Sequence, residues 1–502
     1  MILLTFVLLL KSQTQELKYR VDVEVKLLPV FAQDQEGNPV YDLKRDELEL
    51  TVNGRKQPIA QFTKYAIHYD HTNSRTMSLD LMGVRQARQP ERLLFIIIDR
   101  AFNSLDGLRR SKTIAAQLIE DSGPNERFVL LDNHPGSGLH YLVGPETDKK
   151  KLLAAIQNLS AVTQKWRKDF FKTNRGLPGV SDGYNTTYEA GFRNLWKLKK
   201  SMEKQRYRHN LKRFSNVLSR FKFALQTVTC PKITYIISEG PARAALSTEY
   251  NGKVKITAGE IEEEPVFYRT YLFNYFKDIA KAVNEGGSVL HTINPQKLGE
   301  SIEEDLSGEM GLSYLAKEGG GQYFAGSKLE QVITNIKRAT AAYYELAIAI
   351  KGDTAQRMKL ELRCKRPGVK VYNPGYAEKD VPYNKMKELQ KKLFAFDAMN
   401  NGDWSRIAGS VSALDLKKLS NKKSGDIRSY TFEATIPQNL IGKKADLFFI
   451  QYNPDTHNVQ MKLKRQTLTH QLQASITGQK GETLNLVVIE PQTTTCLVGR
   501  IR

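Results

Sequence analysis

An unbroken apolar run that ends in a carboxylate constrains the fold of this chain more than any other stretch. The run is Arg-Leu-Leu-Phe-Ile-Ile-Ile-Asp, residues 92–99. A strand with one solvent-exposed face would alternate apolar and polar residues. An unbroken apolar run instead indicates a strand that is covered on both faces and is usually central and parallel. Ligands of open α/β sheets bind at the carboxyl ends of such strands. We therefore expect an α/β domain around this strand, with Asp99 where a site would lie.

Strand-like and helix-like patterns alternate from residue 90 to about 340. The predicted covered strands are residues 127–132, 139–143 and 232–238, a further strand is predicted at 288–293, and the predicted helices are residues 105–119, 271–283, 310–317 and 329–339. Asp148 is expected to cap the helix that follows it. Repeated β-α alternation predicts a doubly wound, mainly parallel sheet.

The flanking segments are β-rich. Apolar residues alternate with charged ones from Tyr19 to Leu27, and Asn53-Gly54 is a strong hairpin signal. We expect residues 16–75 to form part of a β-sandwich that residues 341–378 complete, around an α/β domain of residues 90–340. A linker with a helix at 379–427 and a second β-sandwich at 428–502 would follow.

The amino terminus, residues 1–15, has the pattern of a secretory signal peptide. Its apolar core, residues 2–10, is far shorter than the roughly 20 residues of a spanning helix, and polar residues with small side chains follow it. The alternative is an ordinary buried strand. A signal peptide predicts an exported protein, periplasmic or extracellular, and no other segment approaches membrane-spanning length.

The three cysteines, Cys230, Cys364 and Cys496, are widely spaced and form neither a metal motif nor a dense disulfide framework. Buried structural cysteine is the default interpretation. In an oxidising compartment one disulfide remains an alternative, but the sequence does not indicate which two of the three cysteines would form it.

A basic insertion, residues 161–222, carries much of the formal net charge of +21. Between Lys165 and Lys222 there are 16 Lys and Arg against 4 Asp and Glu. A solvated helix face and a site for an acidic extracellular protein are equally open; anionic lipid, acidic glycan and nucleic acid remain alternatives, although export disfavours nucleic acid. The candidate anion-binding residues are Lys165, Arg167, Lys168, Lys172, Lys199, Lys200, Lys204, Arg206 and Arg208.

The order of motifs resembles a family, the von Willebrand factor A-like (vWA-like) secreted proteins of the Acidobacteria type. The resemblance covers about residues 21–378. The segments that carry it are residues 30–40 with 43–52, the strand at 93–99, Ile-Thr-Tyr-Ile-Ile-Ser-Glu-Gly at 233–240, Leu-Ala-Lys-Glu-Gly-Gly-Gly-Gln-Tyr-Phe at 315–324 and Arg-Pro-Gly-Val-Lys-Val-Tyr-Asn-Pro-Gly-Tyr at 366–376. It implies an exported A-domain flanked by β modules, which binds proteins, often through a divalent metal.

The family's metal motif is degenerate in this sequence. Its Asp-x-Ser-x-Ser positions are Asp99, Ala101 and Asn103, its Thr position is Asn185 or, after a shift of one residue, Thr186, and its last Asp is Glu239. Mg²⁺ requires near-octahedral oxygen ligation, and Ca²⁺ accepts looser geometry. Because Ala101 offers no oxygen, we expect a vestigial site in which Asp99 caps backbone amides, with metal-free partner binding still open.

The leading hypothesis is an exported, non-catalytic protein-binding or assembly protein. The expected partner is an acidic protein of the cell envelope or the extracellular space, and both homo-oligomers and hetero-oligomers remain alternatives. The alternatives are a metal-assisted hydrolase using Asp99, Asp132 and Glu239, or a basic binder of nucleic acid or an anionic polymer. No Gly-x-Ser-x-Gly, His-Glu-x-x-His or phosphate-loop motif supports an enzyme.

Overall fold

A computed structural model describes residues 23–66, 92–160, 205–241, 266–296, 308–351, 357–399 and 411–501, apart from short gaps within these ranges. The predicted signal peptide at 1–15 and residues 161–204 of the basic insertion lie outside them. Within the described ranges, no helix is both long and apolar enough to cross a membrane.

A six-stranded sheet forms the centre of the α/β part, in the order β10-β9-β8-β5-β6-β7. All pairings are parallel except that of β6 with β7. Every residue of the predicted central strand, β5, is buried. The bounds are β5 Arg92–Asp99, β6 Glu126–His134, β7 Gly138–Glu146, β8 Lys232–Ile237, β9 Ser288–Ile293 and β10 Gly320–Phe324. The prediction of a covered strand at 139–143 was wrong, because β7 is an antiparallel edge strand and is only partly buried.

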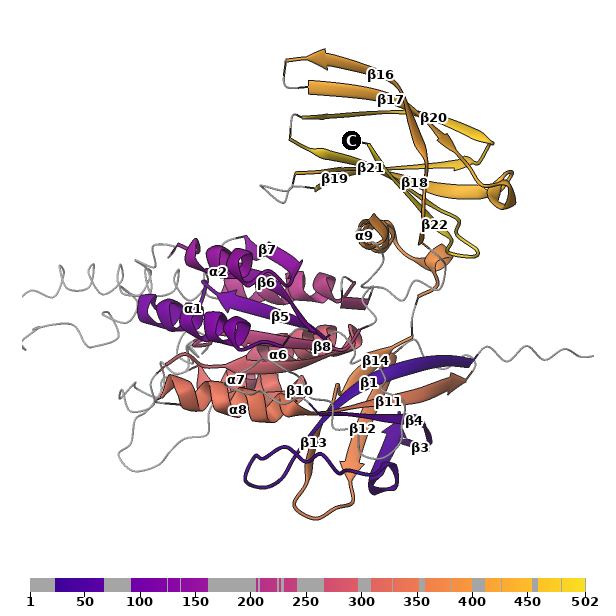
Figure 1. The fold of residues 1–502 in the computed structure, drawn as a ribbon. Coiled ribbons are helices and arrows are strands. Elements are labelled where there is room, and N and C mark those ends of the chain that lie inside the picture. The colour runs from indigo at the N-terminus through magenta and orange to yellow at the C-terminus, as the bar shows by residue number, and fades with distance from the viewer. Residues whose placement is uncertain are drawn as a thin grey trace, which may run out of the picture.

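Helices cover both faces of this sheet (Figure 1). On one face, α1 Leu105–Glu120, α2 Lys149–Gln157 and α8 Leu329–Ala341 share a core with Leu94, Ile96 and Ile98 of β5. On the other, α6 Val266–Glu285, α7 Glu309–Glu318 and helical residues 208–223 pack on Leu93, Phe95 and Ile97. Asp148 caps α2 as predicted, accepting hydrogen bonds from the backbone N–H groups of Lys150 and Lys151. The unbroken apolar run is therefore explained by two cores that use alternate residues of one strand.

Two four-stranded sheets combine residues from before and after the α/β part. Their orders are β13-β1-β11-β4 and β14-β12-β2-β3, and one apolar core contains residues of both. At the predicted hairpin, Asn53 and Gly54 have φ of 51° and 78°, as the tight turn between β2 and β3 requires. The bounds are β1 Val23–Gln33, β2 Leu48–Val52, β3 Arg55–Gln57, β4 Ile59–Ala66, β11 Ala342–Lys351, β12 Arg357–Cys364, β13 Lys370–Tyr372 and β14 Tyr376–Glu378.

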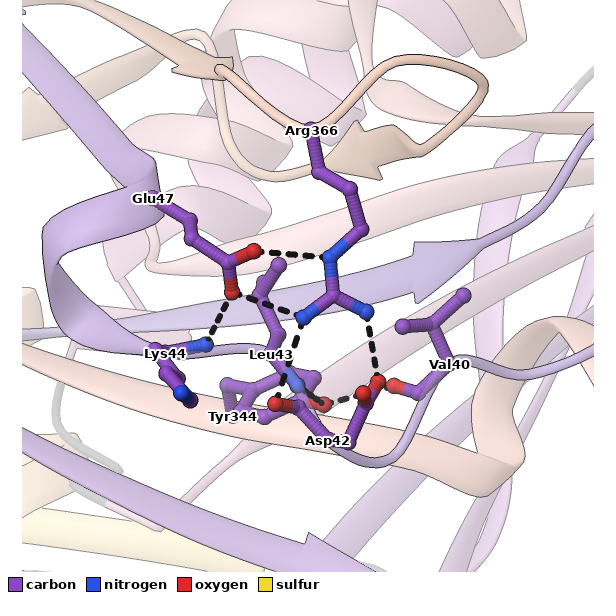
Figure 2. Close-up of polar contacts among 7 residues, drawn as sticks. All are labelled: Val40, Asp42, Leu43, Lys44, Glu47, Tyr344 and Arg366. Carbon is purple, nitrogen blue, oxygen red and sulfur yellow. Dashed lines mark hydrogen bonds and ion pairs between the residues drawn. The ribbon is translucent and has the colours of Figure 1, made fainter.

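Arg366 ties the loop before β2 to the turn after β12 (Figure 2). Its Nε and Nη2 donate to the two carboxylate oxygens of Glu47 at 2.7 and 2.8 Å, and its Nη1 donates to Asp42 at 2.6 Å. The hydrogen bonds from Arg366 lower the pKa of Glu47 to about 2. Tyr344 of β11 donates its hydroxyl proton to the Val40 carbonyl in the same loop, so segments about 300 residues apart are joined.

The carboxy-terminal strands form two further sheets, β15-β22-β21-β18-β19 and β16-β17-β20. The helix α9 Glu388–Met399 packs on the outer face of the first (Figure 1). These strands begin at Val411 rather than at the predicted residue 428; β16 is an exposed edge strand with few apolar residues, so it shows no clear alternation. The bounds are β15 Val411–Ala413, β16 Leu416–Ser424, β17 Ile427–Thr435, β18 Lys444–Tyr452, β19 Val459–Thr467, β20 Gln471–Gln479, β21 Thr483–Ile489 and β22 Cys496–Ile501.

The three cysteines carry free thiols in this structure. Cys496 is buried, whereas Cys230 and Cys364 are partly exposed.

Candidate functional site

Asp99 lies at the carboxyl end of β5, and its side chain is enclosed by protein. Its Oδ1 accepts hydrogen bonds from the backbone N–H groups of Ala101 at 2.9 Å and Phe102 at 3.1 Å. The same oxygen accepts from the side-chain amide of Asn133 at 3.0 Å. Its Oδ2 accepts from the Ser238 hydroxyl at 2.5 Å. Asp99 thus organises the turn after β5 and holds the ends of two neighbouring strands to it.

Burial raises the pKa of Asp99 to about 6, although the hydrogen bonds from Ser238, Phe102, Ala101 and Asn133 act in the opposite direction. Removing a carboxylate from water disfavours its charged form more than these donors favour it. The ionised Asp99 side chain therefore lowers the stability of the folded state at neutral pH.

Glu239, directly after Ser238 at the end of β8, caps the helix α1. Its Oε2 accepts from the backbone N–H of Ser104 at 2.8 Å, and its Oε1 accepts from the Ser104 hydroxyl at 2.6 Å. The Ser104 oxygen in turn accepts from the N–H of Gly107 at 2.9 Å, as the N-cap of α1. A carboxylate at a helix amino terminus is favoured by the helix dipole as well as by these donors.

The carboxylate of Glu239 fits closely against the first turn of α1. A Cβ atom on Gly107 would lie 2.1 Å from Glu239 Oε1. Glycine at position 107 is therefore required for the carboxylate to approach the helix.

Asn103 completes the connection between α1 and β8. Its side-chain oxygen accepts from the backbone N–H of Glu239 at 2.7 Å, and its NH₂ group donates to Ser111 Oγ at 2.9 Å and to the Ile237 carbonyl at 3.3 Å. These three partners use both ends of the amide, which is fully buried.

The oxygens of Asp99, Asn103 and Glu239 serve as hydrogen-bond acceptors for the chain itself, which leaves fewer lone pairs for a divalent cation. A metal needs several oxygen lone pairs directed at one point. All four carboxylate oxygens of Asp99 and Glu239 already accept hydrogen bonds, and so does the Asn103 oxygen. In the described ranges, no three or more His, Cys, Asp or Glu residues are grouped to hold a metal ion. Asn185 and Thr186 lie outside those ranges.

Asp132 is not brought together with Asp99 and Glu239. The register of β5 and β6 pairs Asp99 with Asn133 and Ile98 with Asp132, so Asp132 lies on the opposite face of the sheet from Asp99. There it forms an ion pair with Arg100 Nη1 at 2.6 Å. The trio required by the hydrolase hypothesis is therefore not assembled.

Of the candidate anion-binding residues, Arg208 is described and is partly buried on the helix 208–223. Lys165, Arg167, Lys168, Lys172, Lys199, Lys200, Lys204 and Arg206 lie outside the described ranges.

Sequence reasoning missed three contributors to this site: Asn133, Ser238 and the capping role of Ser104. A register argument would have found the first two, since Asn133 and Ser238 lie at the carboxyl ends of β6 and β8, the two neighbours of β5. Polar residues at adjacent ends of parallel strands meet at one edge of the sheet.

Comparisons with known proteins do not show a family to which the chain belongs. No protein-family model matches the sequence, and a search of curated proteins finds no match. Among solved structures, the pilus tip protein Mfa5 of Porphyromonas gingivalis, through its three amino-terminal domains, aligns over 96% of this chain and 99% of its own, at 7% identity and a TM-score of 0.28. The mussel byssus protein PTMP1, whose structure has a zinc-occupied MIDAS motif, aligns over 52% of this chain at 9% identity and a TM-score of 0.25, and the aligned region spans about half (48%) of its length.

Proposed function

We propose that this chain is an exported, non-catalytic protein-binding or assembly protein whose vWA-like α/β domain works without a bound metal. One observation carries the proposal: all four carboxylate oxygens at the ends of β5 and β8 accept hydrogen bonds from the chain itself. A general base or a metal ligand needs an accessible lone pair. In this chain the Asp99 oxygens hold the turn after β5 to the ends of β6 and β8, and the Glu239 oxygens hold the start of α1.

The charge of the chain supports an acidic protein of the cell envelope or the extracellular space as the partner. The formal net charge is +21, and residues 165–222 alone contribute 16 basic against 4 acidic side chains. Clustered charge of one sign steers partners of the opposite sign and raises the association rate. A partner held in this way binds more weakly as salt rises.

Metal dependence and charge dependence test the proposal together. The purified chain is analysed for bound metals, then immobilised and exposed to envelope extract at low salt, with and without EDTA. We expect less than stoichiometric metal and capture that is unchanged by EDTA. We also expect capture to fall in the variant Lys199→Glu/Lys200→Glu, but not in Lys443→Glu/Lys444→Glu, which makes the same charge change at exposed positions of the carboxy-terminal part.

Stoichiometric metal that is lost in Asp99→Ala, or capture abolished by EDTA, would overturn metal independence. Equal capture by both lysine variants would overturn the role given to the basic insertion.

A further inference from the structure

An open cleft separates the two carboxy-terminal sheets along one side. The strands β19 and β20 follow one another in the chain but end different sheets, so each presents an edge to this side. Between them lies a cavity of about 590 Å³. The connection 468–470 bounds it at one end, and at the other Gln451 donates a side-chain hydrogen bond to the Thr477 carbonyl across the sheets.

The register of β18 and β19 shows which side chains of β19 face this cleft. Lys464 is paired with Leu447 and Lys462 with Phe449, and residues paired in this way share one face of a sheet. Leu447 and Phe449 belong to the core between the two sheets. Lys462 and Lys464 therefore lie on the inner face of the sandwich, where a core strand would carry apolar residues.

The intervening residues of β19 face the other way. Met461 is paired with Ile450 and Leu463 with Phe448, and all four belong to the apolar cluster under α9. The strand β19 thus alternates between a cationic inner face and an apolar outer face. Gln460 and Gln466 extend the inner face, so that four polar side chains at every second position line the cleft.

The cationic face of β19 has no acidic partner in the described part of the chain. The strand contains no Asp or Glu, and no ion pair is formed there by Lys462 or Lys464, both of which are exposed. The facing strand β20, QLQASITGQ, is also free of acidic residues. A ligand that entered the cleft would meet two ammonium groups about two residues apart, roughly 7 Å along the strand.

The edges themselves indicate the class of ligand. Among the described residues β19 pairs with β18 alone and β20 with β17 alone, so each leaves one row of backbone N–H and C=O groups without a strand partner. Such a row is a template for an added strand. An acidic sugar would instead favour aromatic platforms, and the single aromatic residue lining the cleft, Phe449, is partly buried.

We propose that an extended, acidic segment of another protein chain adds to β19 as a sixth strand and fills this cleft. Its carboxylates lie at alternate positions opposite Lys462 and Lys464, and its intervening apolar residues continue the surface of Met461 and Leu463. The recognised pattern is therefore an alternation of apolar and acidic residues with acidic residues at every second position. This docking surface is separate from the α/β site, and its failure would leave the proposed metal-free function standing.

A synthetic peptide tests the proposal directly. The full chain is titrated with fluorescein-labelled Thr-Val-Glu-Val-Glu-Val-Glu-Val-Thr, and binding is followed by anisotropy and by hydrogen exchange. We expect saturable binding with one peptide per chain and slower exchange in β19. The variant Lys462→Glu/Lys464→Glu should bind about tenfold more weakly or worse, because two attractive cross-strand pairs become repulsive.

Two controls keep the test specific. Lys422→Glu/Lys423→Glu makes the same charge change on the exposed edge strand β16, away from the cleft, and should bind the peptide normally. A peptide of the same composition with its three Glu consecutive should bind weakly, since it cannot place carboxylates at alternate positions. Circular dichroism confirms that both variants are folded.

Three results would overturn the proposal: no binding at millimolar peptide, equal loss of affinity in both lysine variants, or protection of strands other than β19 and β20. Binding of polygalacturonate, with loss in Lys462→Glu/Lys464→Glu and no peptide binding, would assign the cleft to an anionic glycan instead.

Discussion

Replacing Asp99 with asparagine should stabilise the α/β part at neutral pH, and the gain should disappear in acid. Asparagine has nearly the same shape, and its oxygen still accepts from the three donors that serve Asp99 Oδ1. Its NH₂ group donates to Ser238 Oγ after the hydroxyl proton turns away. The substitution therefore removes the buried charge while the hydrogen-bonded frame stays in place.

The magnitude follows from the pKa of Asp99, which burial raises from 3.8 to about 6. The folded state binds the proton more tightly than the unfolded state, so between these values it holds more protons. The free energy of unfolding of the wild type then falls as the pH rises through this window, and the full cost is present above pH 6. A shift of about 2 units corresponds to about 3 kcal/mol, which is the upper limit of the gain expected at pH 8.

The assay must isolate this part of a chain that contains several apolar cores. The protein is equilibrated in urea at pH 4 and at pH 8 and then labelled by a brief deuterium pulse at one fixed pH. Peptides from residues 92–120 report the unfolding of β5 and α1. Asp106→Asn is the matched control, since the Asp106 side chain is 72% exposed at the start of the same helix.

We expect a higher urea midpoint for Asp99→Asn than for the wild type at pH 8 and nearly equal midpoints at pH 4. Asp106→Asn should change little at either pH. A destabilised Asp99→Asn at pH 8, with a wild type whose stability rises between pH 4 and pH 6, would show that the hydrogen bonds outweigh burial and would refute the reasoning.

Three further substitutions test other contacts. Gly107→Ala should destabilise α1 by about 1–2 kcal/mol although alanine normally favours helices, because its Cβ would displace the Glu239 carboxylate from its capping position; the measure is amide exchange in the first turn. Arg366→Lys should increase amide exchange in residues 40–47. The difference from wild type should shrink as the pH falls from 4.5 towards 2, because the ionised Glu47 carboxylate stabilises the folded state fully above pH 4.5 and loses this effect as it is protonated. Lys222→Ala should lower stability by about 2 kcal/mol and loosen the helix 208–223, because the Glu285 carboxylate, with a side chain 2% exposed, would lose one of its cation partners and keep Arg357.

Each of these substitutions has an exposed control on the same element or a neighbouring one. Thr113→Ala in α1, Arg363→Lys in β12 and Lys212→Ala in the helix 208–223 should each change exchange little. Equal effects of a substitution and its control would mean that the named contact is not responsible. A stabilising Gly107→Ala would show that Glu239 does not cap α1.

The sequence was a good guide to covered strands, helix caps and tight turns, and a poor one to edge strands. The covered strand at 92–99, the cap at Asp148 and the turn at Asn53-Gly54 depend on neighbours within a few residues, so periodicity and local hydrogen bonding predict them. β7 and β16 were misjudged because an edge strand is buried on fewer sides, and the identity of an edge is a property of the whole sheet.

The sequence by itself determined that Asp99 follows a central strand, that Ala101 can offer no oxygen and that the chain is strongly basic. Tertiary structure alone decided what Glu239 does and which residues beyond the turn after β5 hold Asp99. Two of the four partners of Asp99, Asn133 and Ser238, lie 34 and 139 residues away, and Ser104 lies 135 residues from Glu239. It also placed Asp132 on the opposite face of the sheet and turned two lysines of β19 into the cleft between sheets. The reason is physical: whether a carboxylate or an ammonium group is free to bind depends on the donors and acceptors that folding brings to it, and these come from strands that are neighbours in space alone.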